Sequence, residues 1–371
     1  MSRRILIWVQ HLLGIGHFMR AKLVAEALSS AGHEVMLLSG GQVPAGSTVH
    51  GVIVVQLPAV RAKDELFDDL VDENGRPVSS QLLQARREAV LEAYRRFVPD
   101  CVITETFPFG RRLVQAELLA LLETIVSSTR RPKLVASIRD VLQRPRKAER
   151  AQAMVDLARR SYDGILVHSD PGIVPAETGF PEIVQVRDLF KYTGYICRGV
   201  RADHPTRSEV LVSAGGGAVG QSLTKTAEEA RKLSRLGRLP WTIVTGPLSD
   251  SALSSDSGLT KVRSLADFPS RLANAAVSVS QAGYNTMTEA LRARTPTVVV
   301  PFETEREREQ ITRAQCFQSH GLVEVVRNRD LTPANLAMAI DAAADKKMAM
   351  HSINLEGQHG TVEAVREIMS K

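Results

Sequence analysis

The stretch from Ser278 to Pro301 reads SVSQAGYNTMTEALRARTPTVVVP. A β-branched run ends at Ser280, a glycine turn follows, and a helical pattern then leads to a second β-branched run that ends at Pro301. Strand, helix and strand in succession are typical of a parallel sheet covered by helices. The stretch therefore predicts one unit of a doubly wound α/β domain.

The same alternation extends along the whole chain in two series. In the first, strands are predicted at residues 5–9, 34–38, 53–57, 101–104, 134–138 and 165–168, and helices at 18–31, 80–97, 111–129 and 147–160. In the second, strands are predicted at 209–214, 241–245, 276–280, 297–300 and 323–326, and helices at 221–236, 286–293, 305–319 and 333–344. Both series predict parallel sheets.

The length of 371 residues exceeds what one hydrophobic core usually supports, which favours two domains. A polar segment with a proline separates the two series. We predict an N-terminal domain at 1–197, a linker at 198–208 and a C-terminal domain at 209–371, whose last helix can pack back on the N-terminal domain. Ligands of such sheets bind outside the carboxyl ends of the strands, so the site is expected between the domains.

Composition excludes several classes of protein. The net charge is +6, but aromatic residues make up only 5% and no nucleic-acid-binding module is visible, so no nucleic acid is expected as a partner. The apolar runs are too short to span a bilayer, and the N-terminus resembles a first strand rather than a signal peptide. Three widely spaced cysteines favour a reducing cytoplasm. The acid-rich segment 63–77 is expected to be a surface loop, either a solvated connection or a lid.

In each series, a glycine turn follows the first strand. The sequence HLLGIGH at 11–17 places Gly14 and Gly16 where the backbone can approach a ligand at a helix N-terminus. A dinucleotide fingerprint is incomplete there, so no nicotinamide cofactor is expected. In the second series, the consecutive Gly215, Gly216 and Gly217 are suited to bind a diphosphate through backbone amides, or form a tight structural turn.

The stretch at 278–301 carries the most informative side chain, Glu289. A carboxylate near the mouth of a glycine turn can accept charge-assisted hydrogen bonds from two vicinal hydroxyls of a ribose. The simpler interpretation is that Glu289 interacts favourably with the helix dipole.

These residues resemble the MurG-type N-acetylglucosaminyltransferases of glycosyltransferase family 28, within a branch of predicted bacterial transferases. The pattern Ser-x-Ala-Gly-x-x-Thr-x-x-Glu begins at Ser280, Pro-x-x-x-x-Pro begins at Pro296, and Gln310 closes the motif. The resemblance implies a GT-B fold, in which two Rossmann-like, doubly wound domains face one another across a cleft. It also implies transfer of a hexose or N-acetylhexosamine from a nucleotide-diphosphate sugar, with a UDP-sugar as the expected donor, and inversion at the sugar.

The resemblance also implies roles for individual residues. Glu289 would hold the ribose and Gln310 the donor sugar, while the base would be bound by backbone atoms near Arg263 and Leu265. The remaining implied donor-site residues are Gly215, Gly216, Gly217, Gly283, Asn285, Thr286 and Glu309, and those on the acceptor side are Gly14, Gly16 and His17. The chain departs from the family at Gln281 (commonly Arg), Gly217 (commonly Ser) and Glu309 (commonly Gln). These departures, and a divergent segment at 104–112, leave the donor sugar, the nucleotide and the acceptor open.

Two residues are candidates for the base that accepts the proton of the acceptor hydroxyl. His17 can do so at neutral pH, and Glu105, at the end of a predicted strand, can act as the base or polarise His17. Glycine-turn amides and helix N-termini can neutralise a leaving diphosphate, so neither a metal ion nor a cofactor is expected.

Three alternatives stay open. The same scaffold serves a UDP-sugar epimerase or hydrolase, and a nucleotide-sugar-binding regulator without turnover would need only the donor residues. A peripheral contact with the inner face of the membrane is a further hypothesis, based on Phe107 and Phe109 beside Arg111 and on the basic run at 144–150. The sequence does not predict the oligomeric state.

Overall fold

The computed structural model describes residues 2–44, 46–64, 68–198, 205–215, 220–246, 254–256, 258–305, 307–346 and 353–371. The chain divides into two units. The N-terminal unit comprises Met1–Pro171, Phe180–Ile196 and Glu356–Lys371, and the C-terminal unit comprises Gly172–Gly179 and Cys197–Leu355. Gly216 and Gly217 lie outside the described residues.

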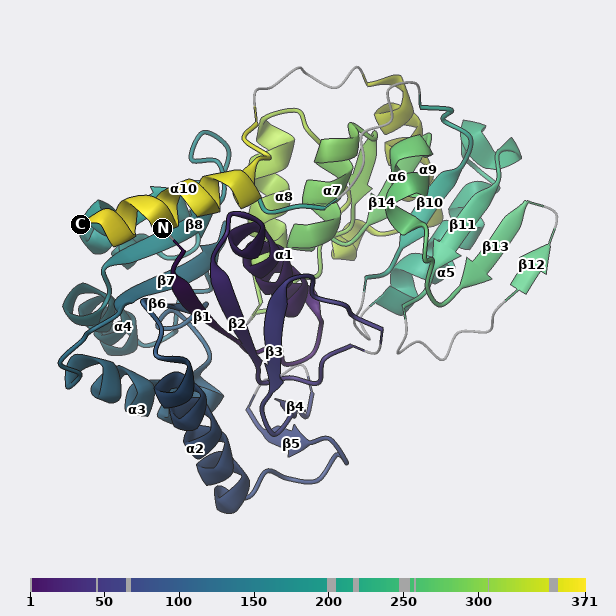
Figure 1. Ribbon diagram of the computed structural model, residues 1–371. Coiled ribbons are helices and arrows are strands. Elements are labelled where there is room, and N and C mark those ends of the chain that lie inside the picture. Colours follow the sequence, from purple (N-terminus) through teal and green to yellow (C-terminus); the bar gives the residue numbers. More distant parts are fainter. Residues whose placement is uncertain are drawn as a thin grey trace. The chain divides into compact units, whose positions relative to one another are not determined.

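The N-terminal unit is built on a seven-stranded parallel sheet with the order β3-β2-β1-β6-β7-β8-β9 (Figure 1). Its strands are β1 (Arg4–Val9), β2 (Glu34–Ser39), β3 (Val52–Gln56), β6 (Cys101–Glu105), β7 (Lys133–Arg139), β8 (Gly164–His168) and β9 (Phe190–Tyr192). All five residues of β6 and of β8 are buried, as expected for strands covered on both faces. The first six strands of this sheet were predicted from their apolar runs, but β9 was not.

The α-helices that the structure describes in this unit are α1 (Gly16–Ser30), α2 (Ser80–Phe97), α3 (Gln115–Val126), α4 (Ala148–Ser161) and α10 (Gly357–Ser370). Helix α2 begins after Ser79, whose hydroxyl accepts a hydrogen bond from the Leu82 amide. Helix α3 begins later than predicted because a 3-10 turn, η1 (Arg112–Val114), precedes it. The main core lies where Phe18 and Leu28 of α1 pack on Ile5 and Ile7 of β1.

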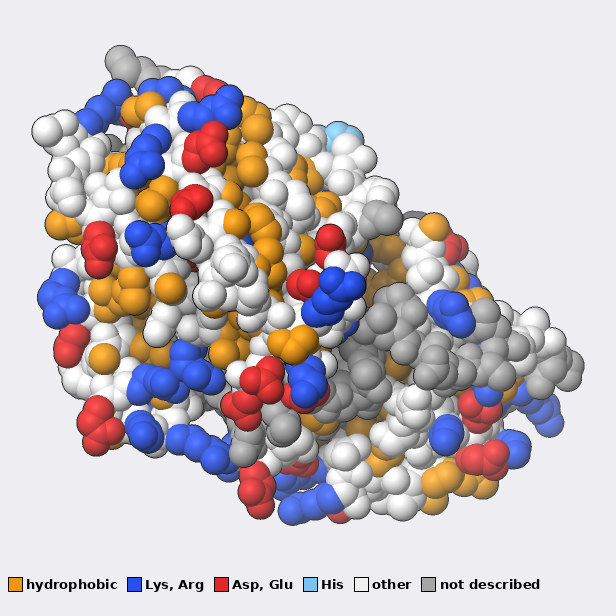
Figure 2. All heavy atoms as spheres, turned by 90° about the horizontal axis from the view of Figure 1, so that it is seen from below, with side chains coloured by type: hydrophobic (Ala, Val, Ile, Leu, Met, Phe, Trp, Pro, Cys, Tyr) orange, Lys and Arg blue, Asp and Glu red, His pale blue; other side chains and the backbone are white. Residues whose placement is uncertain are grey.

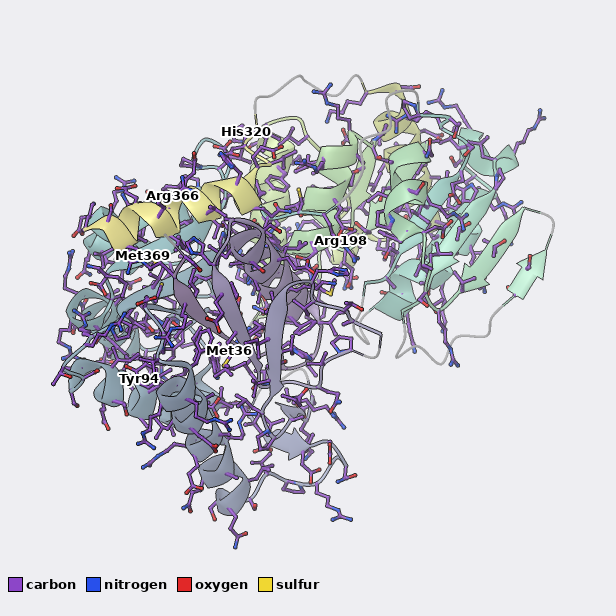
Figure 3. The ribbon with its side chains drawn as sticks, viewed as in Figure 1. Met36, Tyr94, Arg198, His320, Arg366 and Met369 are labelled. Carbon is purple, nitrogen blue, oxygen red and sulfur yellow. The ribbon has the colours of Figure 1, made fainter. Side chains whose placement is uncertain are left out.

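The last helix, α10, packs on the N-terminal unit beside α1 and β8 (Figure 1). Val365 and Ile368 are buried in the same core as β1, while Arg366 and Met369 are labelled on α10 in Figure 3. At Gly357 and Gly360 the helix approaches the backbone of residues 193–195 so closely that a Cβ atom would clash. The predicted packing of the last helix on the N-terminal domain is thus confirmed, and the C-terminal unit ends at Leu355 rather than at Lys371.

The acid-rich segment 63–77 is not wholly a loop. Strand β4 (Val60–Ala62) pairs antiparallel with β5 (Leu70–Asp72), and Val60 and Val71 are buried. The Asp72 carboxylate accepts hydrogen bonds from the amides of Asn74 and Arg76 across the turn at Gly75, which has φ 77°. These local bonds stabilise a hairpin-like end where the sequence analysis expected irregular structure.

The C-terminal unit contains a second seven-stranded sheet with the order β12-β13-β11-β10-β14-β15-β16. Its strands are β10 (Val210–Ser213), β11 (Trp241–Val244), β12 (Ser254–Asp256), β13 (Leu259–Val262), β14 (Val277–Ser280), β15 (Thr297–Val299) and β16 (Glu324–Val325). Among the described strands of this sheet, β12 alone runs antiparallel to its neighbour. Strands β12 and β13 were not predicted from the sequence because neither contains a continuous apolar run.

Helices of this unit are α5 (Gln221–Arg231), α6 (Phe268–Asn274), α7 (Tyr284–Ala293), α8 (Glu309–Ser319) and α9 (Pro333–Asp345). The helix predicted at 221–236 ends at Arg231, because Ser234 bonds Asp341 and caps a separate 3-10 turn, η5 (Arg235–Arg238). Helix α6 was not predicted from the sequence. The core packs Val210, Trp241 and Val279 of the sheet against Leu336 and Ile340 of α9.

Candidate active site

His17 and Glu105 meet at the carboxyl edge of the N-terminal sheet. Strand β1 leads through the glycine turn into α1, whose second residue is His17, and the adjacent strand β6 ends at Glu105. Nδ1 of His17 lies 2.8 Å from Oε1 of Glu105. The Glu105 side chain is 1% exposed and that of His17 is 16% exposed. The two base candidates therefore form one pair, in which only the imidazole is accessible to a substrate.

Three further donors surround the Glu105 carboxylate. Oε1 accepts a hydrogen bond from Arg20 and another, of 2.9 Å, from the Thr106 hydroxyl. Nη2 of Arg111 lies 3.4 Å from Oε2. Since charge-assisted hydrogen bonds are stronger than neutral ones, this cluster fixes the position of Glu105 and, through it, of His17.

The turn after β6 places Arg111 in this cluster. Thr106 and Arg111 both have φ 65°, in the left-handed region that side chains disfavour. A Cβ atom at Gly110 would lie 2.7 Å from Cγ2 of Thr106, so a larger residue there would displace the Thr106 side chain. The tight turn brings the Arg111 guanidinium back to the carboxylate from which the turn started.

The charges of the pair at neutral pH follow from these surroundings. Burial alone would raise the pKa of Glu105, but His17, Arg20 and Arg111 together hold it well below its ordinary value. Burial and the charge of Arg111 hold the pKa of His17 well below 6.5, although Glu105 acts in the opposite direction. Glu105 is therefore an anion and His17 a neutral imidazole at pH 7.

The tautomer of His17 follows from its partner. Nδ1 lies 2.8 Å from Oε1 of Glu105 and 3.2 Å from Nη2 of Arg20, which can only donate. Because the contact with the carboxylate is the shorter one and an ionised carboxylate cannot donate, we assign the imidazole proton to Nδ1. Nε2 then carries the lone pair. A neutral imidazole oriented in this way by a buried carboxylate is the arrangement of a general base.

The glycine turns around this pair differ in what they accommodate. No described atom lies within 4 Å of a Cβ atom built on Gly14, so the space beside it is open. Gly41 follows β2, and a Cβ atom there would lie 2.5 Å from the ring of His11. Gly40 is similarly close to Gln10 and Arg86. The glycines after β2 allow the segment after β1 and helix α2 to approach.

At the carboxyl edge of the C-terminal sheet, two glycine turns lie against each other. Gly215 follows β10 with φ 75°, and Gly246 follows β11 with φ 88°. A Cβ atom at Gly246 would lie 2.5 Å from the carbonyl oxygen of Gly215. The predicted diphosphate turn thus begins in a conformation that requires glycine.

The turn before α7 carries the predicted ribose-binding residue. Gly283 is the N-cap of α7, and no described atom lies within 4 Å of a Cβ atom built on it. Asn285 and Thr286 are half-buried in the first helical turn, while Glu289, in the second, is 6% exposed. Nε of Arg198, labelled in Figure 3, donates to Oε1 of Glu289 over 3.1 Å. Burial raises the pKa of Glu289, and Arg198 opposes this shift.

Gln310 and Glu309 begin helix α8 and differ in their partners. Oε1 of Gln310 accepts a 3.0 Å hydrogen bond from the amide of Phe302, which follows Pro301. Glu309 pairs at 2.7 Å with Arg313, a fully buried residue that also donates to the carbonyl of Ala282 over 2.8 Å. Glu309 therefore supports the Gly283 turn through Arg313. Its contact with a donor sugar stays a prediction.

Of the residues near the predicted base-binding segment, Arg263 is exposed and Leu265 is partly buried against a small core that includes Leu211 and Ala290. The Leu265 side chain is thus used for packing, which leaves its backbone for a ligand.

Sequence reasoning missed four arginines of these sites: Arg20, Arg111, Arg198 and Arg313. The spacing of His17 to Arg20 and of Glu309 to Arg313 places each pair on one helix face, which is a usable signal. Arg198 and Arg111 approach their partners through tertiary structure and irregular turns, for which the sequence gives no local pattern.

The hypothesis of an aromatic membrane patch is wrong in its aromatic part. Phe107 and Phe109 are each 3% exposed, and Phe109 packs edge-on against Phe180. Arg144, in the basic run, is paired with Glu182. Figure 2 shows Lys and Arg side chains interspersed with Asp and Glu on the face that it presents. Within the described ranges, no helix is long and apolar enough to cross a membrane, and no group of three or more His, Cys, Asp or Glu residues is placed to hold a metal ion.

Comparison with solved structures shows the class of fold to which this chain belongs. A glycosyltransferase described as CalG4, the calicheamicin glycosyltransferase, superposes with a TM-score of 0.62 at 17% identity, covering 100% of this chain and 94% of that one. MurG of Acinetobacter baumannii gives 0.57 at 14% identity, covering 99% and 100%. SsfS6 of Streptomyces sp. SF2575, solved with thymidine diphosphate, gives 0.58 at 18% identity, covering 100% and 96%. The chain has the GT-B fold of these proteins.

The sequence of the C-terminal half shows the family of this domain. Residues 210–368 match the model of the glycosyltransferase family 28 C-terminal domain. An 86-residue segment is 30% identical to the UDP-N-acetylglucosamine--N-acetylmuramyl-(pentapeptide) pyrophosphoryl-undecaprenol N-acetylglucosamine transferase of Brucella anthropi, and covers 23% of each chain. The Brucella canis enzyme of the same description is 31% identical over 80 residues, which is 21% of its length. The C-terminal domain of this GT-B protein belongs to glycosyltransferase family 28.

Proposed function

We propose that this chain is a glycosyltransferase that moves a hexose or N-acetylhexosamine from a UDP-sugar to a hydroxyl group, with His17 as the general base. The observation that carries the proposal is the 2.8 Å contact between Nδ1 of His17 and the buried carboxylate of Glu105. The C-terminal domain supports the choice of donor through its family and its pair of glycine turns.

In the proposed reaction, Nε2 of His17 accepts the proton of the acceptor hydroxyl as its oxygen attacks the anomeric carbon. The bond from that carbon to the diphosphate oxygen breaks, and UDP leaves with the electron pair. Attack opposite the leaving group inverts the configuration. Glu105 stabilises the imidazolium that forms, and general-base assistance of this kind is worth roughly 10² to 10⁴ in rate.

The leaving diphosphate gains negative charge, which backbone amides can stabilise. The N-terminus of α7 at Gly283 presents such amides and has no side-chain cap, and Gly215 begins the second predicted turn. Donors fixed before the reaction stabilise developing charge effectively. We therefore propose transfer without a divalent metal ion or a cofactor.

A product assay tests the proposal. The purified chain is incubated with UDP-sugars labelled in the sugar and with a panel of hydroxyl acceptors, with and without EDTA. Transfer of label to an acceptor, undiminished by EDTA, is the expected result. An epimerised sugar nucleotide identifies an epimerase, release of free sugar without an acceptor identifies a hydrolase, and binding without turnover identifies a regulator. Each of these three outcomes contradicts the proposal.

Glu289 and Gln310 should separate in their effects on donor binding. If Glu289 holds the ribose, Glu289→Ala weakens both UDP and the UDP-sugar by about 10-fold or more, because a charge-assisted hydrogen bond is lost. Gln310→Ala weakens mainly the UDP-sugar. Calorimetry with both ligands measures the difference, and Gln318→Ala, a neighbouring glutamine on α8, is the control. Equal losses of both ligands in both variants contradict the assignment.

The pH profile should report the lowered pKa of His17. A base must be unprotonated, so activity is lost as the pH falls through its pKa. Because the pKa of His17 lies well below 6.5, kcat/KM should stay constant from pH 7.5 down past pH 6.5 and fall only below it. A profile measured from pH 5 to 8 with saturating donor checks this. An acidic limb centred at or above pH 6.5 is inconsistent with the neutral imidazole described above.

A further inference from the structure

The Arg111 side chain has a positive charge and hydrogen-bond donors that its described surroundings use only in part. It is 10% exposed, and its one ion pair within the described structure is the 3.4 Å contact of Nη2 with Oε2 of Glu105. The buried Nε–H donates to no group in the described ranges. A guanidinium has five N–H donors, and a buried donor without a partner is costly. Arg111 is therefore held at the site with most of its hydrogen-bonding capacity unused.

The negative charge of Glu105 does not explain why a second guanidinium, that of Arg111, lies beside it. Oε1 of Glu105 already accepts hydrogen bonds from Arg20, Thr106 and His17. Arg20 alone balances the negative charge of the carboxylate, and Arg111 adds a second guanidinium to it. Burial lowers the pKa of Arg111, Glu105 opposes this shift, and the charges of Arg139 and Arg20 add to it. A further anion beside Arg111 would, like Glu105, oppose the lowering of its pKa.

The backbone conformation of Arg111 is also unfavourable. Arg111 is the N-cap residue of the three-residue turn η1 and has φ 65°, which is disfavoured for a residue with a side chain. The fold nevertheless keeps its guanidinium beside the pair formed by His17 and Glu105.

We infer that Arg111 binds a carboxylate or phosphate group of the acceptor, so that the enzyme selects an anionic acceptor and presents its hydroxyl to His17. The inference rests on the proposed function and adds the class of acceptor to it. A planar guanidinium binds such groups through paired hydrogen bonds. The donor also carries phosphates, so the experiment distinguishes the two sources of negative charge.

The first measurement uses acceptors in matched pairs, each a sugar with and without an ionised group, such as a methyl glycoside and the corresponding glycosyl phosphate. Assays at pH 8 keep His17 neutral in every variant. The wild type should favour the anionic member by about 10-fold to 100-fold in kcat/KM, and Arg111→Gln should lose this preference through KM. Arg111→Lys should recover part of it, since it keeps the charge without the planar fork.

The matched control is Arg112→Gln. Arg112 is the next residue, its side chain is 43% exposed, and it lies 4.0 Å from Asp68. This variant removes the same charge from the same turn and should keep the full preference for anionic acceptors. If Arg111→Gln lowers kcat equally for both members of a pair, or if Arg112→Gln has the same effect as Arg111→Gln, Arg111 does not select the acceptor.

Two binding measurements do not depend on turnover. Inorganic phosphate should raise the Tm of the wild type at saturating UDP, and this increase should be absent in Arg111→Gln. Calorimetry should give the same Kd for UDP in both proteins. A 10-fold weaker Kd for UDP in Arg111→Gln assigns the anion to the donor and overturns the inference, as does the absence of a phosphate effect in the wild type. If no UDP-sugar is turned over at all, the proposed function fails, whereas the phosphate measurement still decides whether Arg111 binds an anion.

Discussion

His17→Ala is expected to lower kcat by roughly 10² or more while leaving the affinity for UDP almost unchanged. His17 lies on α1 of the N-terminal unit, whereas Glu289, Gln310 and the glycine turns assigned to the donor belong to the C-terminal unit. Glu105 orients the imidazole, and His17→Ala removes the group that we propose to accept the proton. Steady-state kinetics with a saturating acceptor, and calorimetry with UDP, measure the two quantities separately.

The control for this variant is His50→Ala, which removes an exposed histidine of the same unit. It should leave both quantities unchanged. If His17 only positions the acceptor, the loss in His17→Ala appears in the KM for the acceptor and kcat is retained. A folded His17→Ala protein with normal kcat and KM would exclude both roles, because Glu105 is too deeply buried to replace His17.

Most of the fold could be predicted because its central strands are buried on both faces. Such strands consist of continuous apolar runs, as in CVIT at 101–104 and LVASI at 134–138, and they stand out against amphipathic helices. Strands β9, β12 and β13 lack this signal. Strand β12 reads SSD and pairs antiparallel at the edge of its sheet, where burial does not constrain the sequence.

The site could be predicted in part, for a related reason. The carboxyl ends of adjacent parallel strands meet at one edge, so residues that follow β1 and β6 had to approach each other although they are 88 positions apart. The glycine turns could be predicted because glycines are clustered directly after predicted strands. The arginines that set the charge state were not, because Arg111 reaches Glu105 only through a left-handed turn, and Arg198 reaches Glu289 across 91 positions.

The state of Glu105 links the stability of the N-terminal unit to catalysis. In the folded protein its pKa lies well below 4.5, so the ionised form stabilises folding above that pH. This stabilisation is lost as the pH falls through the folded pKa. Arg20, which is 2% exposed, depends on the carboxylate for its neutralisation, and His17 depends on it for its tautomer. One carboxylate thus has two separable roles.

Glu105→Gln should therefore affect both quantities. The amide cannot neutralise Arg20, and removing one charge of a buried pair typically costs about 3–5 kcal/mol in the free energy of unfolding. It also cannot stabilise the imidazolium that would form on His17, and the comparable substitution in serine proteases lowers kcat by roughly 10⁴, so a loss of up to this size is expected. Denaturant unfolding and kinetics on the folded protein measure the two effects.

Glu117→Gln is the matched control, because Glu117 is also a buried glutamate of the N-terminal unit paired with a buried arginine. Its carboxylate accepts hydrogen bonds from Arg86 over 2.8 Å and from Nε1 of Trp8 over 2.9 Å. Glu117→Gln should lose a similar amount of stability and keep its kcat. If both variants lose kcat in proportion to their stability, Glu105 has only a structural role. If only Glu105→Gln loses kcat, then the 2.8 Å contact with His17, rather than charge burial in general, determines the rate.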